Sequence, residues 1–160
     1  ISGSMAVRSL MENNGSEKNK KIKIKGLDHL SVAVPDLEKA IEFYQNSFGC
    51  EVSNTKILEN QGVKIAYVDL GNVQLELMEP YGETSPIKKF LDRNSSGGIH
   101  HFCLRTEDFE GALQTTRQEG MQVLGDGSAS ISHHGKKFFF IHPKDTFGSL
   151  IEIEEDQNDH

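Results

Sequence analysis

The sequence contains one pattern twice, and this internal repeat is the feature that most limits what the chain can fold into. The first copy, residues 26–38, begins Gly-Leu-Asp-His-Leu and runs to Asp-Leu-Glu. The second copy, residues 98–110, begins Gly-Ile-His-His-Phe and runs to Asp-Phe-Glu, so that His101 occupies the place of His29. Self-similarity of this kind indicates two copies of one supersecondary unit that share a core.

Each copy ends on a glycine-led, strand-like segment with a glutamate between apolar residues, Glu76 in the first copy and Glu152 in the second. Strand alternation places each glutamate on the face that the histidine of its copy occupies. A carboxylate there is costly to bury unless it is paired or bound to a metal. We therefore predict that His29, Glu76, His101 and Glu152 bind one divalent metal ion between the two modules. A mixed nitrogen and oxygen set suits Zn, Co, Ni or Mn and leaves coordination positions open.

The hydropathy pattern of each copy indicates a strand, a helix and three further strands. In the first copy, residues 27–34 alternate as a strand does, and a helix follows from its N-cap Asp36 to Gly49. The further strands of this copy are expected at 51–57, 63–69 and around Glu76. In the second copy Asp108 caps a helix that Gly120 ends, and the further strands are expected at 121–124, 137–142 and 149–154. The predicted fold is α+β, with two paired βαβββ modules that form a cupped, mixed eight-stranded sheet around the metal site.

The repeat also sets the domain organisation. We predict one domain overall, composed of a flexible leader with a cloning scar (1–25), a first βαβββ module (26–80), a linker (81–97) and a second βαβββ module (98–156).

Composition excludes several classes of function. The net charge of −7, with basic residues concentrated in the leader, does not suit nucleic-acid binding, which depends on neutralising phosphates. No apolar run approaches the roughly 20 residues of a membrane span. Cys50 and Cys103 form no CxxC motif and indicate free thiols in a reducing compartment, so we expect a cytoplasmic protein.

The remaining histidines have no place in the symmetric site. Strand alternation puts His100 on the face opposite to His101, which suggests a structural role. His133, His134 and His142 have no counterpart in the first copy, and we expect them in loops or around the site.

From about Leu27 to Glu155 the chain resembles the vicinal oxygen chelate superfamily and, within it, the methylmalonyl-CoA epimerases. The matches include Asp28-His29, the linker segment 79–87 and the His-Pro-Lys segment 142–144. The resemblance implies an isomerase that inverts the α-carbon of methylmalonyl-CoA, or a close acyl-CoA, through proton abstraction and a metal-stabilised enolate. It implies the same four metal ligands and a homodimer.

The same resemblance suggests the catalytic residues and the substrate contacts. Glu152, and Glu76 as its counterpart, are the predicted proton carriers. The lysines Lys136, Lys137 and Lys144 are expected at the mouth of the cavity, where they would bind the phosphates of CoA.

The sequence departs from the resemblance at two positions and leaves two other functions open. Ile65 stands where bacterial epimerases often carry a glutamate, and Asn60 stands where an acidic residue is common, so the second proton carrier is undetermined. A glyoxalase I-type lactoylglutathione lyase would use the same ligands, and a non-catalytic small-molecule binding protein would have the same fold. The native metal, the preferred acyl group and the oligomeric state are also left open.

Overall fold

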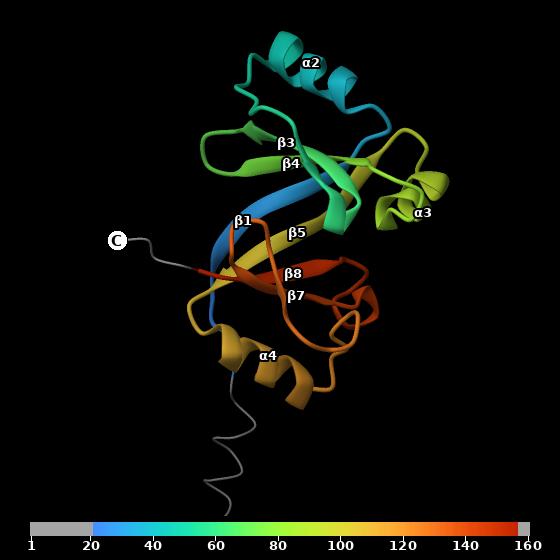
Figure 1. Cartoon of the computed structure of the whole chain (residues 1–160). Helices are drawn as coiled ribbons and strands as arrows, with labels where there is room; N and C mark the ends of the chain where they lie inside the picture. The colour runs from blue at the N-terminus through green and yellow to red at the C-terminus, as the bar shows by residue number, and fades with distance from the viewer. Residues whose placement is uncertain (1–20, 157–160) are drawn as a thin grey trace, which may run out of the picture.

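A computed structural model describes residues 21–156 (Figure 1). The first module contains, in order, β1 (Ile24–Ala33), α2 (Leu37–Phe48), β2 (Lys56–Leu58), the 3-10 helix η1 (Glu59–Gln61), β3 (Val63–Asp69) and β4 (Gln74–Pro80). The linker holds α3 (Pro86–Arg93). The second module contains β5 (Gly98–Thr106), α4 (Phe109–Gln118), β6 (Ser130–Ile131), β7 (Lys137–Ile141), the 3-10 helix η2 (Pro143–Asp145) and β8 (Ile151–Glu155). The predicted βαβββ plan of both modules is confirmed.

The strands form one sheet of eight in the order β2-β3-β4-β1-β5-β8-β7-β6. The two modules meet at its centre, where β1 and β5 pair antiparallel. Within each module the last strand runs parallel to the first, β4 beside β1 and β8 beside β5. The sheet is therefore mixed, and its strand order is symmetric about the β1–β5 pair, as the repeat predicts.

The helices that follow β1 and β5 are capped as the sequence predicts. The side chain of Asp36 accepts a hydrogen bond from the Lys39 amide at the start of α2, and Asp108 accepts one from the Gly111 amide at the start of α4. Gly49 ends α2 with a φ of 64°, in the left-handed region that favours glycine. No helix within residues 21–156 is long and apolar enough to cross a membrane.

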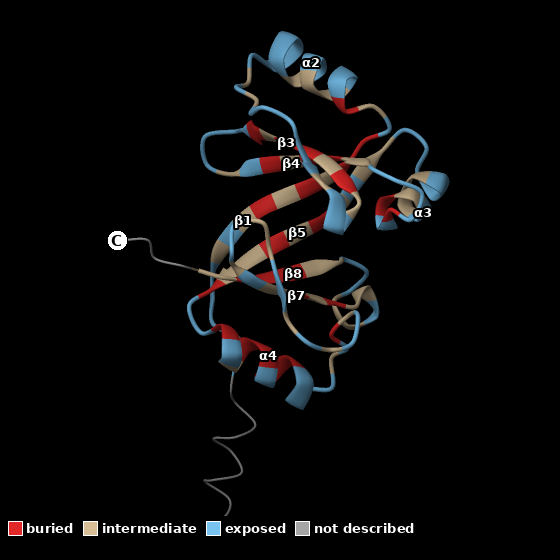
Figure 2. Cartoon of the chain, in the orientation of Figure 1, coloured by how far each residue is buried: buried red, intermediate tan, exposed pale blue. Residues whose placement is uncertain are grey.

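Each of these helices covers a separate apolar core. Beneath α2, Leu37 packs with Val68 and Leu77, and beneath α4, Phe109 packs with Phe139 and other apolar residues of β7 and β8. In Figure 2 the buried face of α4 points toward the sheet, and buried positions alternate with less buried ones along the central strands. The face of the sheet that turns away from α2 and α4 is left to line a cavity.

The structure differs from the predicted strands at two places. Val52 makes only an isolated bridge with Val68, so the predicted strand 51–57 is reduced to β2. Val123 likewise makes a single bridge, with Ile141, and β6 becomes the outer strand of the second module. Val52 and Val123 each face the core beside a helix. An apolar run in the sequence predicts that burial, but it does not fix how many consecutive residues pair with a neighbouring strand.

The start of β1 also lies earlier than predicted. β1 begins at Ile24, within the predicted leader, where Ile24 pairs with Thr106 of β5. Lys25 beside it forms ion pairs of 2.6 Å to Glu107 and 3.0 Å to Asp156. Residues 1–20 of the predicted leader, with the cloning scar, lie outside the described residues.

Candidate metal centre

The register of the sheet brings the predicted ligands together from four neighbouring strands. His29 lies on β1, and Glu76 on β4 pairs with Ser31, two residues after His29. The second module repeats this arrangement, since Glu152 on β8 pairs with Cys103, two residues after His101 on β5. Side chains two residues apart in a strand share a face, so each histidine and its glutamate point into the same side of the sheet.

Three of the four predicted ligands form one compact, buried group. The Nε2 atom of His29 lies 3.3 Å from Oε1 of Glu152, and Nε2 of His101 lies 3.9 Å from the same oxygen. The candidate ligand atoms of these three residues all lie within 4.8 Å of one another. Because one carboxylate oxygen faces two imidazole nitrogens, the group has the composition of a His/His/carboxylate metal site.

Glu76, the fourth predicted ligand, lies beside this group and is held by two hydroxyl groups. Ser31 donates to Oε1 of Glu76 at 2.9 Å, and the Tyr67 hydroxyl donates to Oε2 at 3.2 Å. The Ser31 hydroxyl is also 2.9 Å from Nε2 of His101, so it connects Glu76 to the group of three. Neither contact with Glu76 was predicted from the sequence, although Ser31 and Tyr67 both lie directly opposite Glu76 in the sheet register.

The state of Glu152 indicates that these residues suit a bound cation. Its Oε1 atom is buried and has no hydrogen-bond partner, although the His29 ring lies nearby. A buried carboxylate oxygen without a hydrogen bond is costly, and a divalent cation would satisfy it. His29, His101 and Glu152, with Glu76 beside them, therefore fit the metal that the sequence predicts.

The charges of the group are strongly coupled. Burial favours the neutral form of His29, but the hydrogen bond to Asp28 and the contact with Glu152 outweigh it and raise the pKa of His29 to about 10. Burial favours the neutral form of Glu152 as well, yet the contact with His29 holds its pKa below the usual value. Without metal, His29 and Glu152 thus form a buried ion pair. Burial lowers the pKa of His101 to about 3, so this ring is neutral.

Two other carboxylates beside the group resist ionisation. Burial raises the pKa of Glu76, and burial together with the charges of Asp28 and Glu152 raises the pKa of Glu154 to about 7. Glu154 follows Glu152 on β8 and lines the same cavity. A cation at the site would offset this accumulation of negative charge.

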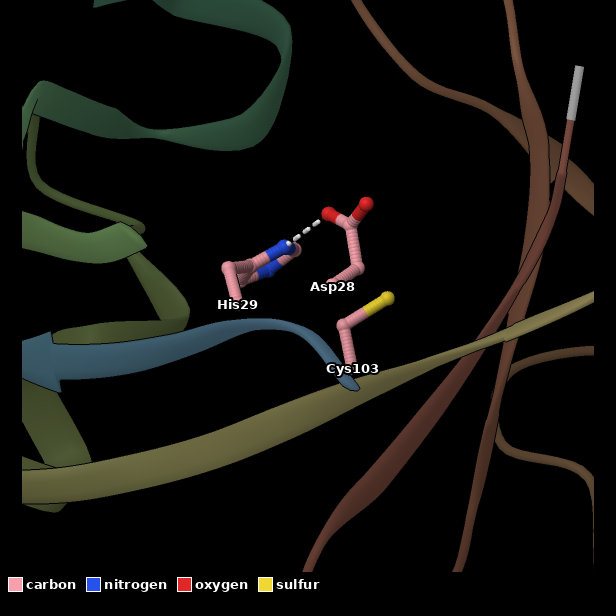
Figure 3. Close-up of side chains that lie close together, drawn as sticks. All are labelled: Asp28, His29 and Cys103. Carbon is pink, nitrogen blue, oxygen red and sulfur yellow. Dashed lines mark hydrogen bonds and ion pairs between the residues drawn. The ribbon is translucent and has the colours of Figure 1, made fainter. Parts of the chain in front are cut away.

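The outer nitrogen of each ligand histidine contacts the residue that precedes it in sequence. Nδ1 of His29 is hydrogen-bonded to Asp28 at 2.8 Å, and Figure 3 shows the two side chains facing each other with the Cys103 thiol beneath them. Nδ1 of His101 lies 2.8 Å from Nδ1 of His100. The prediction that His100 points away from His101 is therefore wrong. The physical reason is a β-bulge, in which Ser31 pairs with His101 and Val32 pairs with Ile99, so that His100 is left unpaired and re-aimed.

The metal group opens into a cavity of about 700 Å³. Residues of η1, the linker and α3 line one part of the cavity, including Asn60, Tyr81 and Ile87. Apolar residues of the second module, Phe140 and Leu150 among them, line another part. A cavity of this size, with apolar walls and a few charged groups at its base, suits a small organic ligand.

The other residues that the sequence analysis singled out fall inside and outside this cavity. His133 and His134 line it, and Nε2 of His133 is 3.2 Å from the Tyr67 hydroxyl. His142 instead accepts a hydrogen bond from the Lys144 amide and caps η2. Ile65 is fully buried in a third core cluster with Met78 and Ile87, so no carboxylate reaches the cavity from this position.

The three lysines expected at the cavity mouth are not among the residues that line it. Lys136 lies 3.8 Å from Glu154, which does line the cavity. Lys137 pairs with Glu110 of α4 at 3.3 Å, on the helix-covered face of β7, and Lys144 is exposed in η2. A role for these lysines in binding CoA stays a prediction.

Comparisons with known proteins show which family and which solved structures the chain is similar to. Residues 28–140 match the profile of the Glyoxalase/Bleomycin resistance protein/Dioxygenase superfamily. The ethylmalonyl-CoA/methylmalonyl-CoA epimerase of Cereibacter sphaeroides is 43% identical over 129 residues, which are 81% of this chain and 96% of the relative. The crystal structure of methylmalonyl-CoA epimerase from Mycobacterium tuberculosis is similar at a TM-score of 0.75 and 34% identity, covering 84% of this chain and 89% of that one. A Streptomyces coelicolor methylmalonyl-CoA epimerase variant in complex with 2-nitronate-propionyl-CoA has the same TM-score of 0.75, at 32% identity, covering 85% of this chain and 97% of that one.

Proposed function

Because the chain belongs to the glyoxalase/bleomycin resistance protein/dioxygenase superfamily, we propose that it is an epimerase that inverts the α-carbon of methylmalonyl-CoA or a close acyl-CoA. The observation that carries this proposal is the buried group of His29, His101 and Glu152 at the base of the cavity. Relatives that share most of the chain are named for this reaction, and one of them is described in complex with methylmalonyl-CoA itself.

The reaction requires a proton to leave the α-carbon and to return to its opposite face, so the main barrier is the negative charge that develops on the enolate. A divalent cation held by His29, His101 and Glu152, with Glu76 beside them, would supply Lewis-acid stabilisation of that charge. A mixed nitrogen and oxygen set favours Zn, Co, Ni or Mn for this role.

The proton carriers that we propose are Glu152 and Glu76. They come from β8 and β4, on opposite sides of the central β1–β5 pair, so each module supplies one of the two proposed carriers. Glu152 is buried and lines the cavity, and its Oε1 atom lies 3.3 Å from Nε2 of His29. Glu76 is fixed by the Ser31 and Tyr67 hydroxyls, which favours a single orientation of its carboxylate.

The CoA part of the substrate needs contacts beyond the metal group. The apolar wall around Phe140 and Leu150 suits the uncharged part of an acyl-CoA, and we propose Lys136, Lys137 and Lys144 for its phosphates. A homodimer and a cytoplasmic location complete the proposal, although several relatives are named as mitochondrial proteins.

A direct test supplies one pure epimer of methylmalonyl-CoA to the Co-loaded protein and follows formation of the other epimer. We expect Glu152→Gln to lose at least about a hundredfold in turnover, the lower range for loss of general acid–base catalysis. Glu154→Gln is the matched control, because Glu154 lies two residues along the same strand and lines the same cavity. Full turnover by Glu152→Gln with metal bound would contradict the proposed role of Glu152.

The same protein tests the two alternative functions. A lactoylglutathione lyase would convert the methylglyoxal–glutathione adduct and leave methylmalonyl-CoA unchanged. A binding protein without catalytic activity would convert neither compound.

A further inference from the structure

In both halves of the metal group, the residue that precedes the ligand histidine contacts the ring of that histidine. Asp28 and His100 occupy the same place in the two sequence copies, directly before the ligand histidine. Each contacts the outer nitrogen of that histidine at 2.8 Å, Asp28 through Oδ2 and His100 through Nδ1. We propose that His100 is a positioning residue, which orients His101 for metal binding as Asp28 orients His29. This proposal rests on the metal site of the proposed function.

The position of His100 is held from two sides. The bulge in β5 turns its side chain toward His101 instead of the opposite face of the sheet. Phe90 of α3 packs against the ring of His100 edge to face, with 5.2 Å between the ring centroids. The ring is half-buried and lines the cavity. These contacts hold Nδ1 of His100 against His101 before any ligand binds.

The inner nitrogens of both ligand histidines face the metal group. Nε2 of His29 lies 3.3 Å from Glu152, and Nε2 of His101 lies 2.9 Å from the Ser31 hydroxyl. A histidine that binds a metal through Nε2 carries its hydrogen on Nδ1 and donates it to a neighbouring acceptor. For His29 that acceptor is the Asp28 carboxylate. For His101, the group in place to accept is Nδ1 of His100.

The hydrogen-bond pattern also explains why a histidine suits this position. Ser31 donates its hydroxyl hydrogen to Glu76, so it can only accept from Nε2 of His101. In the metal-free protein the ring hydrogen of His101 is therefore on Nε2. Nδ1 of His101 is then unprotonated, and Nδ1 of His100 donates to it. When Nε2 binds a metal the roles reverse, and His100 accepts. A neutral imidazole can serve both roles by changing tautomer, whereas an ionised carboxylate can only accept.

The test compares Co(II) affinity in two variants of His100, measured by the visible absorbance of the bound ion. His100→Leu retains the packing against Phe90 but removes the acceptor, and we expect its Kd for Co(II) to rise about 10–100-fold. His100→Asp copies the first half of the site and restores an acceptor, so its Kd should stay within about threefold of the wild-type value. Phe90→Leu removes the ring that packs against His100 but keeps the acceptor, so its Kd should rise by less than that of His100→Leu.

The outcomes separate a positioning role from a structural one. Unchanged affinity in His100→Leu would overturn the proposal, and so would a loss in His100→Asp as large as the loss in His100→Leu. Absence of Co(II) binding by the wild-type protein would overturn it together with the metal site of the proposed function. Normal binding in all variants, with epimerase activity in the wild-type protein, would overturn the role of His100 alone.

Discussion

Metal binding should release one proton, although two histidines serve as ligands. In the metal-free protein His29 is protonated at neutral pH, because the hydrogen bond to Asp28 and the contact with Glu152 outweigh burial and raise its pKa to about 10. His101 is neutral already, because burial lowers its pKa to about 3. A metal ion must therefore displace a proton from His29 and none from His101.

The size of this effect follows from the same values. Between pH 7 and a pKa of about 10, removal of the proton from His29 costs about 4 kcal/mol, at roughly 1.4 kcal/mol for each pH unit. The side chain of His29 is only 10% exposed, so solvent screens little of this cost. The Kd for the metal should therefore fall about tenfold for each unit of rising pH, until the pH approaches the pKa of His29.

The stability of the metal-free protein should change in the opposite direction. A folded-state pKa above the ordinary value of 6.5 contributes stability that is fully present below about pH 6.5. This contribution is lost as the pH rises toward about 10. Rising pH thus strengthens metal binding while it weakens the metal-free fold, and the two trends share one cause.

The assay is calorimetric titration of Co(II) in two buffers with different enthalpies of ionisation, which counts the protons released. Asp28→Asn removes the strongest partner that raises the pKa of His29 and should reduce the release. Glu154→Gln is the control, because Glu154 also titrates near neutrality, with a pKa of about 7. Release of two protons, or a Kd independent of pH, would contradict the charge states assigned to His29 and His101 in the metal-free protein.

Three further predictions concern single side chains. Tyr67→Phe removes the hydroxyl that donates to Glu76 at 3.2 Å, and metal affinity measured by Co(II) titration should fall by about 1.5 kcal/mol. An unchanged affinity would show that Tyr67 does not hold Glu76 in place. Leu77→Ala empties a fully buried position beneath α2 and should cost about 2–5 kcal/mol in the free energy of unfolding, measured with urea, whereas a cost below about 1 kcal/mol would contradict the assigned core. Asp36→Ala removes the N-cap of α2 and should cost about 1 kcal/mol in the same free energy of unfolding. The control is Glu42→Ala, at an exposed position of the same helix, and equal losses in the two variants would argue against a specific capping effect.

The repeat made most of the fold predictable, because two copies of one pattern must form equivalent elements. It also placed His29, His101 and Glu152 correctly on one face, since strand alternation depends only on sequence spacing. His100 was misplaced because the bulge in β5 arises from pairing with β1, and no local pattern reports where two distant strands fall out of register.

The contacts of Glu76 could not be predicted for a related reason. Its partners Ser31 and Tyr67 belong to the two strands that flank β4, and a hydrogen bond across strands requires the register that only tertiary pairing sets. The sequence also could not show on which side of the sheet each lysine lies. Lys136 and Lys137 are consecutive and point to opposite sides, and only packing decides which side faces the cavity.

Metal-dependent enolate chemistry can be followed by proton NMR of methylmalonyl-CoA in D2O, with protein stripped of metal and then reloaded with Co or Zn. We expect loss of the α-proton signal only with the reloaded protein, and no loss with the His101→Ala variant under the same conditions. Persistence of the α-proton signal with folded, metal-loaded protein would contradict the proposed epimerase activity.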